Sequence, residues 1–342
     1  MTKTLEELEA AASLVYRHLT PTAQIRWPLL GERTGCEVWV KHENHTPIGS
    51  FKVRGGLVAL DELRRRRPDL TGIASATRGN HGQSLAFAAR VHGLRATVVV
   101  PHGNSREKNA AMRALGAELI EHGRDFEEAL ESCGTLAEER GLELLESFDP
   151  ALARGVATAG LELLRAAPDL DTVYVPLGLG SGICGMMLAR EALGLRTDIV
   201  GVVAAEAPTY ALSFERGEPV ATKSSATFAD GIAVREPHPE ALERIRGGVE
   251  RIVSVAEREI ADAVRHYYTD THNLAEGAGA AALAALLRER DRMAGRKVGL
   301  MLTGGNIDRD AYREILAGGV PRTTTGIPDS PAGPPGITRT SR

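Results

Sequence analysis

The sequence predicts an α/β protein with parallel strands, and three observations support this fold class. Short runs rich in Val and Ile alternate with segments whose apolar residues recur at helical spacing, which is typical of parallel βαβ units. Glycine-rich turns follow several of the strand-like runs, where ligands bind in open α/β sheets. The 342 residues, 43% hydrophobic and 25% charged, suffice to bury a sizeable core in one or two domains.

The first half of the chain contains one N-terminal helix and four predicted strands. Thr4 and Glu7 form the pattern of a capping box, which starts a helix that runs to about Leu19. Strand-like runs follow at 36–43 (CEVWVKHE), 72–76 (GIASA), 96–101 (ATVVVP) and 117–121 (AELIE). Helical spacing predicts helices at about 80–92, 105–115 and 125–139.

The second half continues the same alternation and ends in a predicted tail. Strands are expected at 172–178 (TVYVPLG), 198–206 (DIVGVVAAE) and 297–305 (KVGLMLTGG). Helices are expected near 182–193, 257–269 and 277–290. Residues 318–342 are rich in Pro, Gly, Ser and Thr and cannot bury enough apolar surface to order themselves, so we predict a flexible tail there.

Composition narrows the classes of function. A net charge of -4 offers no electrostatic reason to bind nucleic acid or an anionic membrane, so a small-molecule ligand is the better expectation. No apolar stretch approaches the roughly 20 residues of a membrane span, and no export signal is apparent. The three cysteines, Cys36, Cys133 and Cys184, have no metal-ligand spacing and fit a reducing cytoplasm.

A glycine-rich loop lies in the stretch YVPLGLGSGICG, residues 174–185. A strand that runs through such a turn into a helix presents backbone N–H groups that bind a phosphate. The same stretch also matches the dinucleotide pattern G-x-G-x-x-G at Gly180, Gly182 and Gly185, with Glu206 near the expected acidic position. An NAD-dependent dehydrogenase is therefore one alternative, and glycines that serve only tight packing are another.

Four further segments decide between these alternatives. They are GSFKVRGG (49–56), ATRGNHGQS (76–84), EGAGAAAL (276–283) and LTGGN (302–306). Together with the glycine loop and TFADGIAV (227–234), and in this order, they resemble the fold type II pyridoxal-phosphate enzymes, specifically the threonine dehydratase and serine racemase branch. The resemblance spans about residues 15–310.

The resemblance implies an architecture and a subunit arrangement. It implies the tryptophan synthase β-like fold, with two open, twisted, largely parallel sheets flanked by helices. The expected large cofactor domain is discontinuous, comprising 1–48 and 148–317, and the small domain comprises 49–147. A homodimer is what the family implies.

The resemblance also implies which residues hold pyridoxal 5'-phosphate. Lys52 would carry the cofactor as a Schiff base, in apolar surroundings that favour its neutral amine. Asn80 would bind the ring oxygen, although its position also suits a helix N-cap. Thr303 would face the pyridine nitrogen as a neutral partner, which favours β-elimination over other reactions. The remaining expected cofactor contacts are Phe51 beside the ring and Gly178, Leu179, Gly180, Ser181 and Gly182 around the phosphate, where Leu179 and Ser181 interrupt the family's run of glycines.

The expected reaction converts a β-hydroxy amino acid such as L-threonine or L-serine into a 2-keto acid and ammonia. Lys52 would remove the α-proton as general base. The resemblance places Thr77, His81 and Gln83 around the substrate carboxylate, with Arg78 beside them. Relatives usually carry two small residues before GNH, where this chain has Thr77 and Arg78. An arginine cannot act as the second acid and base of a racemase, so we expect little racemisation.

Arg78 leaves the side chain of the substrate open. If it binds a distal carboxylate, 3-hydroxyaspartate is the substrate, whereas binding of the α-carboxylate leaves threonine, serine or 3-phenylserine. A structural ion pair is a third possibility for Arg78. A non-catalytic, ligand-sensing relative is a further alternative to the enzyme.

We expect no tightly bound divalent cation. The family's cation site uses a glutamate that matches Glu206, but no second carboxylate follows it in EAPTYALSF, residues 206–214. Hard cations require several oxygen ligands.

Overall fold

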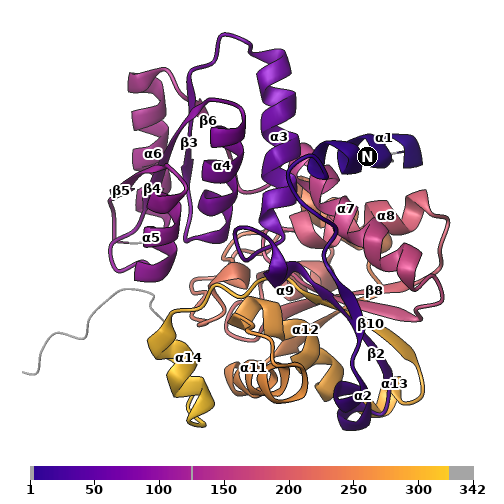
Figure 1. The fold of residues 1–342 in the computed structure, drawn as a ribbon. Helices are drawn as coiled ribbons and strands as arrows, with labels where there is room; N and C mark the ends of the chain where they lie inside the picture. The colour runs from indigo at the N-terminus through magenta and orange to yellow at the C-terminus, as the bar shows by residue number, and fades with distance from the viewer. Residues whose placement is uncertain (1–3, 125, 323–342) are drawn as a thin grey trace, which may run out of the picture.

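A computed structural model describes residues 4–124 and 126–322, and it contains two separate sheets (Figure 1). The larger sheet has six strands in the order β1-β2-β10-β7-β8-β9. Among the described strand pairs of this sheet, only β1–β2 is antiparallel. Its strands are β1 (Gln24–Arg26), β2 (Glu37–His42), β7 (Thr172–Pro176), β8 (Asp198–Ala204), β9 (Arg251–Val255) and β10 (Lys297–Leu302).

The smaller sheet has four parallel strands in the order β5-β4-β3-β6. They are β3 (Gly72–Ala76), β4 (Arg95–Val100), β5 (Glu118–Glu121) and β6 (Glu143–Leu144). All five residues of β3 are buried, as expected for a central parallel strand that is covered on both faces. The prediction of two largely parallel sheets is therefore confirmed, whereas the exact domain boundaries stay a prediction.

Helices cover both sheets (Figure 1). Around the small sheet lie α4 (Asn80–Val91), α5 (Arg106–Ala114) and α6 (Phe126–Arg140), and α3 (Lys52–Arg66) packs on α4. On the large sheet, α8 (Ser181–Ala192) packs on β7 and β8, and α12 (Gly277–Arg288) packs on β7 to β10. The remaining helices are α1 (Leu5–Val15), α2 (Pro28–Thr34), α7 (Pro150–Ala166), α9 (Thr209–Arg216), α10 (Pro239–Gly248), α11 (Glu257–Thr271), α13 (Arg290–Met293) and α14 (Arg309–Leu316).

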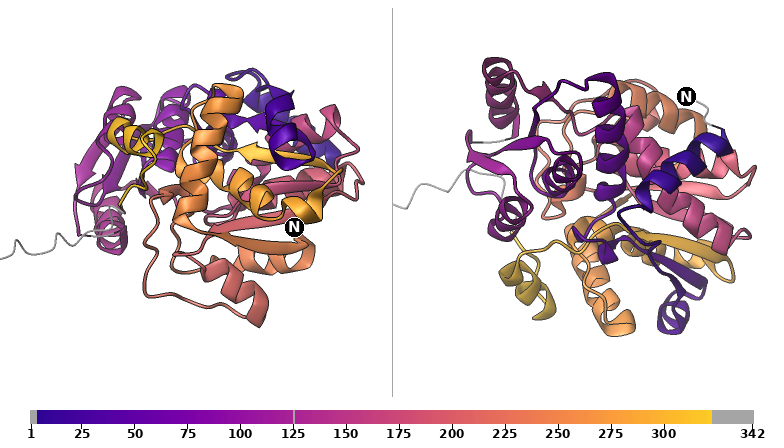
Figure 2. Two further views of the ribbon diagram at one scale, coloured as in Figure 1. Left: turned by 90° about the horizontal axis from the view of Figure 1, so that it is seen from below. Right: turned by 45° about the horizontal axis from the view of Figure 1, so that its top comes forward.

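The two further views in Figure 2 show α14, in yellow, lying beside the layer of the small sheet. Two hydrogen bonds join these parts of the chain. The Ser105 hydroxyl donates to Asp308 Oδ1 at 2.5 Å, and the Arg309 backbone N–H donates to Glu107 at 2.9 Å. The C-terminal segment therefore connects the large-sheet side to the N-terminal end of α5.

A buried ionic cluster anchors α3 to the large-sheet side. Arg54 is fully buried and donates to both oxygens of Glu43, at 2.7 and 3.0 Å, and to both oxygens of Glu162, at 2.6 and 2.9 Å. Glu43 follows β2, and Glu162 lies on α7. Lys41 Nζ also bonds Glu162, so two cations neutralise two carboxylates. Because Arg54 is two residues after Lys52, this cluster holds the first turn of α3 in place.

The predicted elements agree with the structure, and several others were missed. The capping box of Thr4 and Glu7 is present, but the first helix ends at Val15. The predicted strands and helices of both halves are all found within a few residues of their expected bounds. No pattern had indicated α7, which is rich in small residues, or the short β9. Residues 323–342 of the predicted tail lie outside the described residues.

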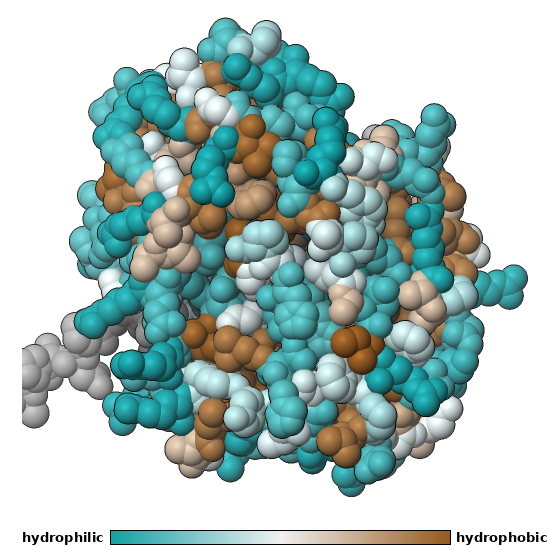
Figure 3. All heavy atoms as spheres, in the orientation of Figure 1, coloured by the Kyte–Doolittle hydropathy of each residue, from teal (hydrophilic) through white to brown (hydrophobic). Residues whose placement is uncertain are grey.

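The surface facing the viewer in Figure 3 is mostly hydrophilic, and its hydrophobic residues form separate small groups. In the described ranges, no helix is long and apolar enough to cross a membrane.

Candidate active site

Two loops that are distant in sequence meet where β10 ends. The Phe51 N–H donates to the Thr303 carbonyl at 3.0 Å, and the Gly305 N–H donates to the Gly49 carbonyl at 3.0 Å. Ser50 and Gly304 form an isolated antiparallel bridge between these bonds. This pairing brings the predicted GSFK and TGGN motifs together and places Lys52 at the carboxyl end of the large sheet.

Lys52 is the first residue of α3, and its amine points to the glycine loop. Lys52 Nζ donates to Ser181 Oγ at 3.0 Å and lies 5.2 Å from the centre of the Phe51 ring. Burial lowers the pKa of the Lys52 amine to about 8, because a charged ammonium group loses its hydration there. The α4 residue Ser84 fixes the backbone, since its hydroxyl donates to the Lys52 carbonyl at 2.6 Å. The structure therefore brings Lys52, Phe51 and Ser181 together as predicted.

The glycine loop connects β7 to the N-terminus of α8. Gly180 has φ +107°, which an L side chain rarely adopts, and a Cβ on Gly178 would lie 2.4 Å from the Gly231 carbonyl oxygen. In the described part of the chain, the backbone N–H groups of residues 178–182 donate to no protein acceptor. Such a row of free N–H groups at a helix N-terminus is an anion site.

Asn80 opens α4, but it is not the N-cap, because Gly79 occupies that position. The Asn80 side chain makes long-range contacts instead. Its Nδ2 donates to Glu276 Oε1 at 2.7 Å, and its Oδ1 accepts from Asn306 Nδ2 at 2.8 Å. The N-cap alternative is therefore wrong. Glu276 and Asn306 belong to the recognised EGAG and TGGN motifs, but no sequence signal assigned these contacts to them.

Glu276 also joins an ionic group that the sequence did not indicate. Lys108 on α5 bonds Glu276 Oε2 at 3.3 Å and Asp230 Oδ2 at 2.5 Å. Burial would lower the pKa of Lys108, but Asp230 and Glu276 raise it above its ordinary value. Burial raises the pKa of Glu276 to about 7, and the Lys108 cation opposes this shift. The group links α5 of the small sheet to two segments of the large-sheet side.

The predicted substrate residues follow β3 and begin α4. Thr77 is buried, and its hydroxyl accepts the Gly79 N–H at 3.1 Å. Gln83 Nε2 is buried without a hydrogen-bond partner in the described protein, and the buried His81 ring has the Glu146 backbone as a polar neighbour. Burial, with the charge of Lys52, lowers the pKa of His81 to about 3, so the ring is neutral at pH 7. Unpaired buried polar groups of this kind indicate a site that a polar ligand completes.

Arg78 lies between Thr77 and Gly79 and is half-buried. Its guanidinium makes no ion pair or hydrogen bond to any residue that the structure describes. The structural ion pair considered for Arg78 is therefore not found there. A guanidinium carries a positive charge, so Arg78 remains available to bind an anion.

Thr303 directly follows the last residue of β10. The residue is 4% exposed, and its hydroxyl makes no hydrogen bond within the described ranges. Neighbouring Gly304 must be a glycine, since a Cβ there would lie 2.4 Å from Glu276 Oε1. Thr303 thus shares one loop with the groups around Asn80.

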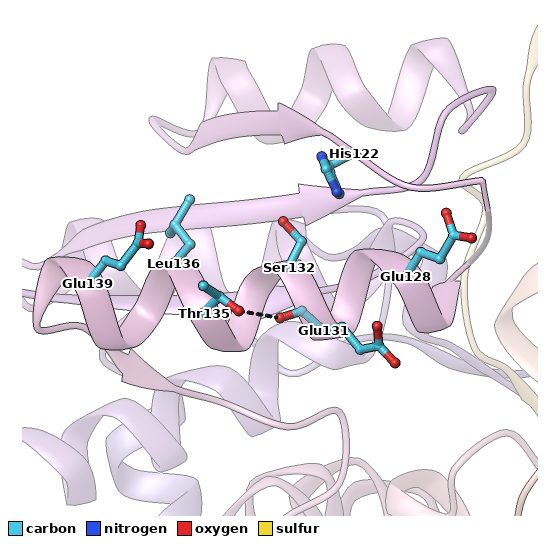
Figure 4. Close-up of a pocket in the computed structure, with 7 residues that line it drawn as sticks. All are labelled: His122, Glu128, Glu131, Ser132, Thr135, Leu136 and Glu139. Atoms are coloured by element: carbon cyan, nitrogen blue, oxygen red, sulfur yellow. Dashed lines mark hydrogen bonds between the residues drawn. The ribbon is translucent and has the colours of Figure 1, made fainter.

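Two other surface features do not belong to this site. An open hollow of about 650 Å³ lies on α6 and is lined by His122, Glu128, Glu131, Ser132, Thr135, Leu136 and Glu139 (Figure 4). None of the predicted site residues lines it. Glu206 is exposed in the turn after β8, and no group of three His, Cys, Asp or Glu side chains suited to a metal occurs among the described residues.

Comparison with known proteins identifies the family. The family model described as "Pyridoxal-phosphate dependent enzyme" matches residues 15–304. The chain is 35% identical to the L-threonine ammonia-lyase of Thermotoga maritima, over 93% of this chain and 79% of that protein. It is 34% identical to an L-threo-3-hydroxyaspartate ammonia-lyase of Pseudomonas sp, over 84% of this chain and 91% of the relative.

A solved structure supports the same fold. The crystal structure of a threonine deaminase from T.th. superimposes with a TM-score of 0.83 at 32% sequence identity, covering 90% of this chain and 99% of that one. These comparisons contradict the dinucleotide interpretation of the Gly180 loop.

The residues present fit pyridoxal phosphate. The free N–H groups of residues 178–182 suit its phosphate, and the Lys52 amine, whose pKa is lowered, suits its aldehyde. A Cβ on Gly182 would lie 3.5 Å from the Phe51 ring, so this ring lies directly beside the glycine loop. The chain therefore belongs to the pyridoxal-phosphate dependent enzymes, as a fold type II member of the threonine dehydratase and serine racemase branch and an ammonia-lyase of the threonine dehydratase type.

Proposed function

We propose that the chain converts a β-hydroxy amino acid into a 2-keto acid and ammonia, with Lys52 as the residue that carries the cofactor and moves the α-proton. The observation that supports this most strongly is the position of the Lys52 amine, 3.0 Å from Ser181 in a loop of free N–H groups. Pyridoxal phosphate, when bound, withdraws electrons from the substrate α-carbon.

Side chains and backbone N–H groups of the protein supply the other functions of the site. The lowered pKa of Lys52 leaves a useful fraction of neutral amine near pH 8, and the neutral amine can accept the α-proton. The N–H groups of residues 178–182 hold the phosphate, with Ser181 and Leu179 in place of two glycines of the family pattern. Asn80 holds the ring oxygen, and Thr303 supplies a neutral hydroxyl to the ring nitrogen. Because Thr303 cannot keep that nitrogen protonated as a carboxylate would, elimination is favoured.

The position of Arg78 suggests that this residue binds a carboxylate of the substrate. A half-buried guanidinium without a protein partner suits bidentate binding of a carboxylate. If that group is the α-carboxylate, the substrate is L-threonine or L-serine, with 3-phenylserine as a bulkier alternative. If it is a distal carboxylate, the substrate is 3-hydroxyaspartate, the compound named for the Pseudomonas relative. Thr77, His81 and Gln83 lie around the substrate α-carboxylate in either case.

Release of keto acid from four amino acids tests this proposal. Purified chain loaded with pyridoxal phosphate is incubated with L-threonine, L-serine, 3-phenylserine and 3-hydroxyaspartate, and kcat/KM is measured for each. Arg78→Ala is expected to lower kcat/KM at least tenfold for the best substrate, about the loss of one charged hydrogen bond. Arg106→Ala, which alters an exposed arginine on α5, serves as the matched control.

The pattern of losses distinguishes the two carboxylates. A loss confined to 3-hydroxyaspartate assigns Arg78 to the distal carboxylate, and an equal loss on all active substrates assigns it to the α-carboxylate. No keto acid from any of the four compounds would refute the proposed elimination. L-serine is expected to give little D-serine, because Arg78 cannot exchange a proton.

We also propose that the chain forms a homodimer. We propose that each subunit has a large domain made of residues 1–48 and 148–317 and a small domain made of residues 49–147. The two separate sheets support the division. Three buried free thiols, Cys36, Cys133 and Cys184, support a reducing compartment such as the cytoplasm. Sedimentation of the full chain tests the dimer.

A further inference from the structure

The side-chain amide of Asn80 is held from two sides by residues outside its own motif. Glu276 Oε1 accepts from Asn80 Nδ2 at 2.7 Å, and Asn306 Nδ2 donates to Asn80 Oδ1 at 2.8 Å. Glu276 precedes α12, and Asn306 follows β10, so both partners come from the large-sheet side, whereas Asn80 begins α4.

These two contacts determine which way the Asn80 amide faces. Above its pKa of about 7, the ionised Glu276 carboxylate only accepts hydrogen bonds, so it requires the NH2 group of Asn80 on its side. Asn306 uses both hydrogens of its own amide, one for Asn80 Oδ1 and one for the Ile48 carbonyl at 2.8 Å. If the Asn80 amide were flipped, its NH2 group would face the NH2 group of Asn306, and its oxygen would face Glu276 Oε1. Neither pair could form a hydrogen bond. The second N–H of the Asn80 side-chain amide remains without a partner among the described residues.

The local backbone provides the space for both partners. A Cβ on Gly304 would lie 2.4 Å from Glu276 Oε1, and a Cβ on Gly49 would lie 2.7 Å from Asn306 Oδ1. Gly49 also has φ +65°, in the left-handed region. Glycines of the GSFK and TGGN motifs therefore let Glu276 and Asn306 approach Asn80.

Glu276 is in turn held by Lys108. Lys108 Nζ lies 3.3 Å from Glu276 Oε2, and both residues are nearly fully buried, with exposures of 5% and 3%. Because Lys108 belongs to α5 and Asn80 to α4, Glu276 receives one bond from each of two helices that flank the small sheet. The carboxylate is thus oriented at both of its oxygens.

We propose that Glu276 and Asn306 are positioning residues that fix the orientation of the Asn80 amide, so that its remaining N–H is directed to the ring oxygen of pyridoxal phosphate. This inference rests on the proposed role of Asn80 in the site. Lys108 supports the arrangement by holding the second oxygen of Glu276.

The test is the dissociation constant of pyridoxal phosphate, measured by titration of the full chain freed of cofactor, together with the absorbance maximum of the bound cofactor. Asn80→Ala, Glu276→Gln and Asn306→Ala are each expected to weaken binding about 3- to 10-fold, the loss of one neutral hydrogen bond. Each double variant with Asn80→Ala is expected to bind no more weakly than Asn80→Ala alone, because the partners act through Asn80.

Asp308→Ala is the matched control. It removes the bond to Ser105 that joins the same two parts of the chain, without touching Asn80. Its dissociation constant is expected to stay within about twofold of the unaltered chain, because the partly buried bond that it removes does not involve Asn80, Glu276 or Asn306. Asn306→Ala keeps the proposal testable if Glu276→Gln does not fold.

The outcomes separate this inference from the proposed role of Asn80. Weaker binding in the Asn80, Glu276 and Asn306 variants, with a shared shift of the absorbance maximum and no added loss in the doubles, supports the inference. If Asn80→Ala weakens binding and neither partner variant does, Asn80 keeps its role and the inference is overturned. Additive losses in the doubles, or an equal loss in Asp308→Ala, also overturn it. An unchanged constant in Asn80→Ala refutes the role of Asn80 itself.

Discussion

Replacement of Arg54 by methionine should strongly destabilise the protein. Arg54 is fully buried and makes four bonds of 3.0 Å or less to Glu43 and Glu162. Arg54→Met keeps a long side chain but leaves Lys41 as the one cation in the cluster beside these two carboxylates. Removal of one partner from a buried ion pair costs about 3–5 kcal/mol. We expect this loss in the free energy of unfolding, against a total of roughly 5–15 kcal/mol for a folded protein.

Urea-induced unfolding, followed by the fluorescence of Trp27 and Trp39, measures this loss. Arg65→Met is the control on the same helix, because Arg65 is exposed and pairs with Asp61 at 2.8 Å at the surface. That change should cost less than about 0.5 kcal/mol. A cost of less than about 1 kcal/mol for Arg54→Met would refute the reasoning, since the cluster would then tolerate an unbalanced charge.

A double variant separates charge balance from lost packing. Arg54→Met combined with Glu162→Met leaves one cation, Lys41, with one carboxylate, Glu43, at 4.0 Å. The double variant should therefore lose less than the sum of the two single variants, by about 0.5–3 kcal/mol. Strict additivity would show that the residues act independently.

Three further predictions concern packing, protonation and metal. Gly155→Ala should lower the free energy of unfolding by about 1–3 kcal/mol, since its Cβ would lie 2.3 Å from the Arg54 carbonyl oxygen. Gly134→Ala on α6, where a Cβ would meet no atom within 4 Å, should raise the free energy of unfolding by about 0.5–1 kcal/mol. Equal urea midpoints for the two variants would contradict this prediction. The rate at which Lys52 reacts with an aldehyde reagent should rise through about pH 8, because its pKa is lowered and the neutral amine is the nucleophile; a midpoint at the ordinary value of 10.5 would oppose this. Dialysis against a chelator should leave keto-acid release unchanged, since no second carboxylate follows Glu206 in residues 206–214, and a loss that Mg²⁺ restores would exclude the prediction.

The parts of the site that lie in short motifs could be predicted from the sequence. The glycine loop and Asn80 each occupy the end of a strand or the start of a helix, and the periodicity of the flanking residues indicates those elements, whereas Lys52 was assigned from its motif alone. Parallel strands of one sheet bring their carboxyl ends to one edge, so the motifs that follow β7 and β10 were expected near one another. The structure confirms the strands and the order of the motifs.

The contacts between distant segments could not be predicted. Lys108 and Glu276 are separated by 168 residues, and nothing near Lys108 distinguishes it from an exposed helical lysine. The buried position of Arg54 has the same cause, because its partners Glu43 and Glu162 become neighbours only when α3, α7 and the end of β2 pack together. The N-cap alternative for Asn80 is wrong for the same reason, because the side chain bonds Glu276 and Asn306, which are distant in sequence.

The most direct test of the account is to identify the lysine that carries pyridoxal phosphate. The loaded chain is reduced with borohydride, digested and examined by mass spectrometry. We predict that the added cofactor mass lies on the peptide that contains Lys52, and that Lys52→Ala abolishes both the label and turnover. A label on Lys41 or Lys108, or turnover by Lys52→Ala, would contradict the central role of Lys52.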